Sequence, residues 1–262
     1  MPNNRNIYLV TFGTKGGQSD FSLSRYRLEN EARYTGWFSD VFNYTAEDLS
    51  SYNRSFTGTG AGWWWWKSVV CQISLNKIKK DDIILFLDAG CSINIKGEKR
   101  FWEYIELCDS GPGFVGFGGG GYWSEIGGGG VIEKIHTKRD LLLHLGCDSP
   151  KYTETTQLGS GLFFVKNNKF GKDLINQFVE LSKNEHFLND STSSNQEYNE
   201  FIAHRHDQSI LSLLVKLRLS ELNNYLFNLR EVSGNIKDDL DFQYPLKATR
   251  INDSHLWNNM FS

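Results

Sequence analysis

An aspartate stands directly after a fully apolar run, at the point where that run ends. Residues 83–87 (IILFL) show no polar alternation, which predicts a central strand covered on both faces, and Asp88, Ala89 and Gly90 follow it. Ligands of open α/β sheets bind outside the carboxyl ends of the strands. A carboxylate held there, without bulky neighbours, is suited to bind a metal ion or ribose hydroxyls. The alternative is a turn or helix-capping aspartate.

Two glycine-containing segments are expected at the same edge of the sheet. Residues 13–17 (GTKGG) follow the apolar run 7–12, and residues 159–161 (GSG) belong to a later strand. The first segment lacks the glycine spacing and the following Lys-Ser/Thr of a P-loop, and it also fails the dinucleotide fingerprint. A nucleoside-triphosphate or NAD enzyme is therefore disfavoured.

The elements that must position these residues alternate between strand and helix patterns. The expected strands cover residues 7–12, 37–42, 83–87, 113–117 and 158–165, and the expected helices cover residues 24–33, 64–80, 101–108, 137–145, 168–182 and 207–219. This alternation predicts an α/β layered fold, related to the Rossmann fold, with a mainly parallel central sheet flanked by helices. No linker divides the chain, so we expect one domain over residues 1–262.

The composition excludes several classes of protein. The chain has 262 residues, 39% of them hydrophobic, and a formal net charge of -3, so it has no overall basic field that would favour nucleic acid. No signal peptide or transmembrane segment is visible, which predicts a cytoplasmic protein. The four cysteines lack zinc-site spacing and are expected to be buried free thiols.

Several segments, taken together, resemble a known family. Residues 60–67 (GAGWWWWK), a lysine-rich helix and residues 81–91 (DDIILFLDAGC) look like the nucleotide-sugar site of a GT-A glycosyltransferase. They are similar to a group of polysaccharide-building enzymes of bacteria and large DNA viruses. Residues 152–166 resemble the acceptor-side strand of such enzymes, and residues 205–214 (RHDQSILSLL) resemble the helix start that faces the transferred sugar. The resemblance spans about residues 5–215.

The resemblance implies a hexosyl- or pentosyltransferase that moves a sugar from a UDP- or GDP-sugar to a hydroxyl of a glycan or glycoconjugate. Asp207 and Gln208 would be catalytic, with Asp207 accepting the hydroxyl proton or stabilising an oxocarbenium-like centre; a simple N-cap is the alternative for Asp207. The expected donor-binding residues are Thr11, Phe12, Gly13, Arg25, Arg33, Trp66, Lys67, Asp88, Ala89 and Gly90. The expected acceptor-side residues are Gln157, Gly159, Ser160, Gly161 and His206.

The chain departs from the family at the metal site. Many such enzymes hold manganese or magnesium between two carboxylates and a late histidine, but Gly90 stands where the second carboxylate would be. A manganese or magnesium ion would then depend on Asp88, the diphosphate, water and His255. His255 as a surface histidine is the alternative. The missing carboxylate also leaves open a carbohydrate- or nucleotide-sugar-binding protein that has lost catalysis. A nucleotidyltransferase is a third possibility.

The four consecutive tryptophans raise a separate question. Neighbouring residues of a helix point about 100° apart, so four indoles cannot share one face. We expect two to pack into the core and one or two to stack on a sugar or base, with Lys67 near phosphate. The alternative has all four in the core and Lys67 solvated. For Arg25 and Arg33, a solvated helix face is likewise the alternative.

Overall fold

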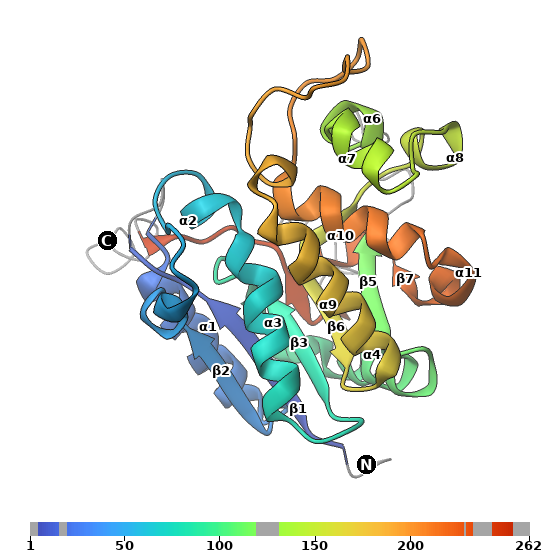
Figure 1. Ribbon diagram of the computed structural model, residues 1–262. Coiled ribbons are helices and arrows are strands. Elements are labelled where there is room, and N and C mark those ends of the chain that lie inside the picture. Colours follow the sequence, from blue (N-terminus) through green and yellow to red (C-terminus); the bar gives the residue numbers. More distant parts are fainter. Residues whose placement is uncertain (1–4, 16–19, 119–130, 228, 233–242, 254–262) are drawn as a thin grey trace.

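The computed structural model describes residues 5–15, 20–118, 131–227, 229–232 and 243–253. Within these residues, six strands form a sheet in the order β2-β1-β3-β6-β5-β7 (Figure 1). Only β6 runs antiparallel to its neighbours, and the other pairs are parallel. The mainly parallel sheet is therefore confirmed. Its strands are β1 (Ile7–Phe12), β2 (Asp40–Tyr44), β3 (Ile83–Leu87), β5 (Phe114–Gly118), β6 (Leu158–Lys166) and β7 (Leu226–Phe227).

Helices cover both faces of this sheet, as Figure 1 shows. On one face lie α3 (Trp65–Lys77), α9 (Lys169–Lys183) and α10 (His206–Lys216), and on the other lie α1 (Ser22–Thr35) and α4 (Glu98–Ser110). The shorter helices are α2 (Gly60–Trp63), α6 (Glu133–His136), α7 (Arg139–His144), α8 (Pro150–Thr153) and α11 (Leu219–Leu222). Every residue of β3 is buried, as its apolar run predicts.

A second pair of strands brings the end of the described chain back to the sheet. β4 (Ser92–Ile93) pairs with β8 (Leu246–Lys247) in antiparallel register. Since β4 follows Asp88 by only a few residues, this pairing places residues 249–253 beside the loop after β3. The local sequence pattern did not predict this contact.

Most element bounds match the sequence-based expectations within a few residues. The strand expected at 37–42 begins instead at Asp40, because Trp37 packs in the core against Phe101, with ring centroids 4.5 Å apart. The four cysteines are buried and free, as predicted. In the part of the chain that the structure describes, no helix is long and apolar enough to cross a membrane.

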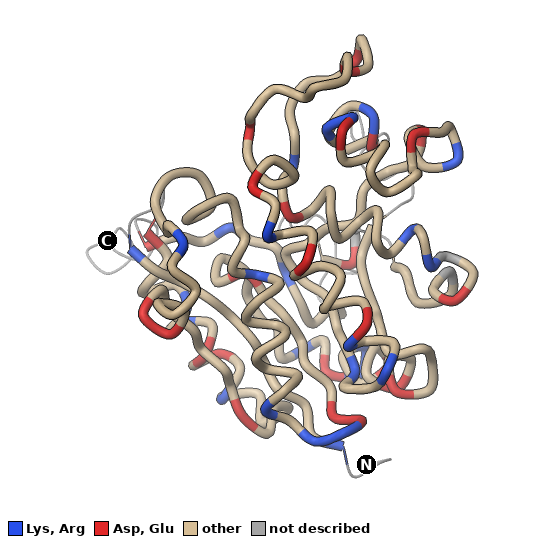
Figure 2. The backbone as a smooth tube through the Cα atoms, in the orientation of Figure 1, with Lys and Arg blue, Asp and Glu red and all other residues tan. Residues whose placement is uncertain are grey.

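Charges of both signs are dispersed over the described chain (Figure 2). Several pair locally on helix surfaces, such as Arg33 with Glu29 and Lys169 with Asp173. Exposed pairs of this kind stabilise a fold by about 1 kcal/mol or less each. Two buried ion pairs differ from them: Lys67 with Asp207, and Lys216 with Glu133.

Candidate functional site

Four elements meet at the carboxyl edge of the central strands and bring Lys67, Asp88, Asp207 and Ser160 together. Asp88 follows β3, Lys67 lies in the first turn of α3, and Asp207 is the second residue of α10. Ser160 lies near the start of β6, and because β6 is antiparallel its amino end reaches the same edge. The sheet thus brings together side chains from four elements of the chain.

The Lys67 ammonium lies between the two carboxylates. Its Nζ is 3.2 Å from Asp88 Oδ1 and 2.8 Å from Asp207 Oδ2, and it donates to Ser160 Oγ at 3.2 Å. An ammonium has three donors, and all three are engaged here. The side chain is only 2% exposed. The alternative of a solvated Lys67 is wrong, and no donor of Lys67 is left to contact a phosphate directly.

The charges of this cluster shift its ionisation equilibria. Burial alone disfavours a charged Lys67, but Asp207 and Asp88 outweigh it and raise its pKa. Burial raises the pKa of Asp88, while Lys67 and, more weakly, Arg250 act in the opposite direction. With both aspartates ionised, one cation faces two anions. The cluster then carries a net negative charge.

Asp88 and Asp207 differ in their access to ligands. The Asp88 side chain is 36% exposed, whereas that of Asp207 is 5% exposed. Gly161 leaves room for Asp88, since a Cβ at Gly161 would lie 3.0 Å from Asp88 Oδ2. The N-cap residue of α10 is Arg205, and no side chain caps this helix start. The N-cap alternative for Asp207 is therefore wrong.

A left-handed turn sets the direction in which α3 begins. Gly60, Ala61, Gly62, Trp63 and Trp64 all have positive φ, between 50° and 88°. Backbone bonds from Trp63 N to Thr59 O and from Trp64 N to Gly60 O close the turn. Non-glycine residues rarely adopt this conformation in succession, and such strain persists only where the surroundings enforce it. Because Trp63 and Trp64 belong to this turn and α3 begins at Trp65, the four indoles do not follow the spacing of about 100° that one continuous right-handed helix would impose.

The tryptophans divide into two pairs. Trp65 and Trp66 are buried, and Trp66 stacks on Phe12 with centroids 4.0 Å apart. Trp63 and Trp64 are half-buried and lie against the His206 ring at 5.0 and 5.2 Å. Two core indoles are thus confirmed, but Trp66, predicted to contact the donor, is one of them. Its ring is covered by Phe12 because both side chains face the core.

A buried network fixes Gln208. Gln157 accepts a hydrogen bond from Gln208 Nε2 at 2.9 Å, and its own amide donates to Glu133 Oε2 at 3.0 Å. Glu133 is fully buried and pairs with Lys216 at 2.7 Å. Gln157, which was predicted to face the acceptor, is thus buried and hydrogen-bonded to Gln208. Glu133 was missed because a glutamate in a short helix gives no local signal of burial.

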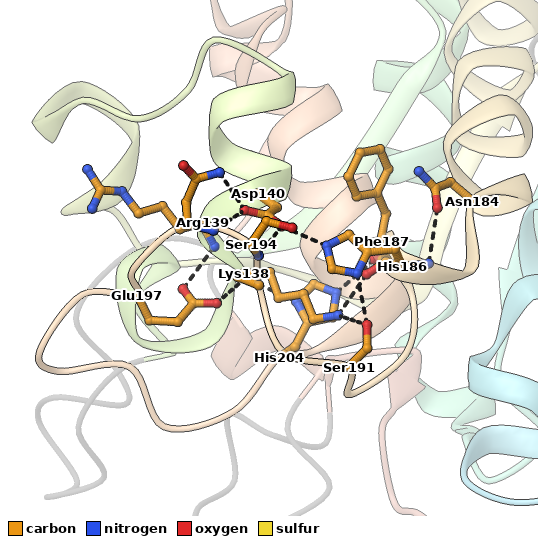
Figure 3. Close-up of polar contacts among 12 residues, drawn as sticks. Lys138, Arg139, Asp140, Asn184, His186, Phe187, Ser191, Ser194, Glu197 and His204 are labelled. Atoms are coloured by element: carbon orange, nitrogen blue, oxygen red, sulfur yellow. Dashed lines mark hydrogen bonds and ion pairs between the residues drawn. The ribbon is translucent and has the colours of Figure 1, made fainter.

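The segment that leads into α10 is anchored by polar contacts, shown in Figure 3. Lys138 Nζ donates to His186 O at 2.8 Å and to Ser191 Oγ at 3.0 Å. The His186 ring contacts Asp140 Oδ2 at 2.7 Å through Nε2 and Ser191 Oγ at 2.8 Å through Nδ1. Nearer to α10, Lys138 N donates to His204 Nδ1 at 3.2 Å and Arg205 N donates to His136 O at 3.0 Å. These two contacts hold the chain just before His206 and Asp207.

The predicted residues after β1 have separate surroundings. Thr11 is buried, and Gly13 is close to Arg25, whose guanidinium donates to Asn43 Oδ1 at 3.0 Å. This group lies at the carboxyl edge, as expected for donor contacts. Arg33 does not: it pairs with Glu29 and with Asp40, which begins β2 at the opposite edge of the parallel strands. Arg33 therefore lies on a solvated helix face, which was the alternative interpretation for both arginines. Arg25 does not, because it is only 9% exposed.

The loop Asp88–Cys91 is held from two sides. Arg27 donates to Ala89 O at 2.9 Å, and from the other side Ile251 N and Thr249 Oγ1 both donate to Gly90 O, at 2.9 and 2.8 Å. Gly159, the remaining predicted acceptor-side residue, is half-buried in β6. The contact with residues 249–251 was missed, because the sequence around them has no regular pattern.

The described residues do not form the two-carboxylate metal site of Asp-x-Asp enzymes. A Cβ at Gly90 would lie 3.1 Å from Arg250 Cα and 3.3 Å from Ile251 O, so a side chain there would be tightly packed against this segment. The inner oxygen of Asp88 faces Lys67. No group of three or more potential metal-ligating His, Cys, Asp or Glu side chains occurs among the described residues. His255, the other predicted ligand, lies outside them.

Comparisons with known proteins give low-identity structural matches. No family model and no curated sequence matches the chain. It is similar to a glycosyltransferase involved in glycosylation of the major capsid of PBCV-1 (13% identity, 68% of this chain and 67% of that one, TM-score 0.38). It is also similar to mouse xyloside xylosyltransferase 1 (10% identity, 95% of this chain and 99% of that one, TM-score 0.47). A third similar structure is glycosyltransferase GlyE of Streptococcus pneumoniae (12% identity, 86% of this chain and 45% of that one, TM-score 0.32).

Proposed function

We propose that this protein is a GT-A-like glycosyltransferase that moves a sugar from a nucleoside-diphosphate sugar to a hydroxyl group. The observation that carries the proposal is the pair of carboxylates, Asp88 and Asp207, held by one buried ammonium at the carboxyl edge of the sheet. Ligands of this fold class bind at that edge. The more exposed Asp88 would face the donor, and Asp207 the reacting sugar carbon and the acceptor.

With both aspartates ionised, the cluster of Lys67, Asp88 and Asp207 is net negative, which suits this reaction. Glycosyl transfer passes through an oxocarbenium-like state in which positive charge develops at the sugar ring. Fixed charges of opposite sign, placed before the reaction, stabilise such a state without reorganisation. Lys67 keeps the two carboxylates in place, and Gln157 accepts a hydrogen bond from the side-chain amide of Gln208, the residue after Asp207. Asp207 would accept the proton of the attacking hydroxyl.

A panel of nucleotide sugars with glycan acceptors tests the proposal. We expect product from a UDP- or GDP-sugar, with hexosyl or pentosyl transfer, and loss of product in Asp207→Ser with donor binding kept. We further propose a glycan or glycoconjugate acceptor, a role in polysaccharide biosynthesis, a cytoplasmic site of action and one domain over residues 1–262. Donor binding without product from any donor, in the intact protein, would contradict transfer.

That outcome would favour the second candidate, a carbohydrate- or nucleotide-sugar-binding protein without catalysis. The observation in its favour is Gly90, which supplies no second carboxylate and packs closely against residues 250–251. In such a protein, Asp207→Ser would alter ligand affinity and nothing else. The two candidates are thus separated by the same variant.

A further inference from the structure

We infer that Arg250 and Arg205 bind the diphosphate of the nucleoside-diphosphate ligand beside Asp88, and that they do so without a metal ion. The inference rests on the proposed function for the identity of the ligand. It arises from the segment 249–253, whose backbone packs closely against Gly90, the position at which an Asp-x-Asp site would carry its second carboxylate. A positively charged residue, Arg250, is thereby held beside this position.

The backbone around Arg250 is held firmly on both sides. Before and after it, Thr249 Oγ1 and Ile251 N donate to Gly90 O. Asp253 then accepts hydrogen bonds from the backbone amides of Leu23 and Ser24 at 2.8 Å each, at the start of α1. Arg250 itself has a φ of 56°, a conformation uncommon for a non-glycine residue. These contacts fix the Cα of an exposed arginine next to the Asp88 loop.

Arg205 comes from the element that carries Asp207. It is the N-cap residue of α10, two positions before Asp207, and it is half-buried. Burial and, more weakly, the positive charge of Arg250 lower the pKa of Arg205. A bound anion would offset both effects. Burial of an unpaired charge is costly, which favours a bound anion as its partner.

The two arginines have free donors, unlike the neighbouring lysine. Among the residues that the structure describes, neither guanidinium makes a side-chain hydrogen bond or ion pair. Lys67 has all three donors engaged by Asp88, Asp207 and Ser160. The two arginines therefore have guanidinium donors available for a diphosphate. Their planar groups can each bind phosphate oxygens through two parallel hydrogen bonds.

Calorimetric titration of the full chain with UDP, GDP and inorganic pyrophosphate tests this inference, in EDTA and in manganese chloride. We expect binding in EDTA, with an affinity unchanged by manganese. Arg250→Ala and Arg205→Ala should each weaken it by roughly 10- to 100-fold, the effect of losing charge-assisted hydrogen bonds. Lys169→Ala removes one positive charge at an exposed and distant position and should leave it unchanged. Arg250→Lys keeps the charge but loses the planar guanidinium, so its affinity should lie between those of the wild type and of Arg250→Ala.

Two results would overturn the inference: binding that requires manganese, or an Arg250→Ala variant that binds all three ligands normally. Because Arg250 is exposed, its replacement should leave the melting temperature unchanged, which keeps the test valid if Arg205→Ala folds poorly. The outcome is separate from the test of transfer. Pyrophosphate binding that depends on the arginines would support the inference even in a protein that transfers no sugar, and sugar transfer with normal binding in Arg250→Ala would refute the inference alone.

Discussion

Replacing Lys67 by methionine removes the one cation that holds the two carboxylates together. The side chains are similar in length, and Lys67 is almost fully buried, so the change alters charge far more than volume. The variant leaves Asp207 without its 2.8 Å partner and Asp88 without its 3.2 Å partner. The fold must then bury an uncompensated anion or protonate it.

The expected magnitude follows from the different burial of the two aspartates. Removing one member of a buried ion pair typically costs about 3–5 kcal/mol. Asp88, at 36% exposed, can regain water, so most of the loss should come from Asp207, at 5% exposed. We expect the free energy of unfolding at neutral pH to fall by about 3–5 kcal/mol, and the loss to shrink in acid as the aspartates take up protons.

Urea denaturation of four proteins measures this effect: the wild type, Lys67→Met, Asp207→Asn and the double variant. If the unpaired anion is the cause, adding Asp207→Asn to Lys67→Met should restore more than half of the lost free energy. Lys169→Met, which removes an exposed lysine, should change stability by less than about 1 kcal/mol. A Lys67→Met loss as small as this control, or no recovery in the double variant, would refute the reasoning.

Three further predictions concern single substitutions. Burial holds the pKa of Asp88 in the folded chain above its ordinary value, so ionisation of Asp88 lowers stability as the pH rises from the ordinary pKa to the raised one. The Asp88→Asn variant should therefore melt no lower than the wild type near neutral pH, yet lose transfer activity. Normal turnover in this variant would exclude a role of Asp88 in catalysis. Asp207→Ser should lower turnover by roughly 10²–10⁴-fold with near-normal donor affinity by titration. Gly60 has a φ of 58°, and a Cβ at this position would lie 2.2 Å from the Trp64 ring. Gly60→Ala should therefore lower the melting temperature clearly. An unchanged melting temperature would argue against the left-handed turn.

Local patterns were sufficient for the elements that carry the site. The apolar run of β3 predicted a buried strand, and the position of Asp88 at its end followed from where that run stops. The periodicity of α3 and α10 predicted helices that begin close to Lys67 and Asp207. These predictions succeed because strand and helix periodicity depend on neighbours within a few residues.

Contacts between distant segments were decided only by the tertiary structure. The sequence singled out Lys67 and Asp207 but placed Lys67 near phosphate, whereas the folded chain directs its ammonium at two carboxylates. The approach of residues 249–251 to Gly90 had no local signal, because it depends on the pairing of β4 with β8.

The sequence by itself therefore determined which residue types stand at the carboxyl edge of the sheet, since that follows from local periodicity and from where each apolar run ends. The tertiary structure alone decided which charge meets which. Lys67, Asp88 and Asp207 come from three elements, and their contacts exist only when α3, β3 and α10 pack together. A charged side chain has the same local sequence whether it meets water, a carboxylate or a ligand, so its partner is fixed by packing between segments far apart in the chain.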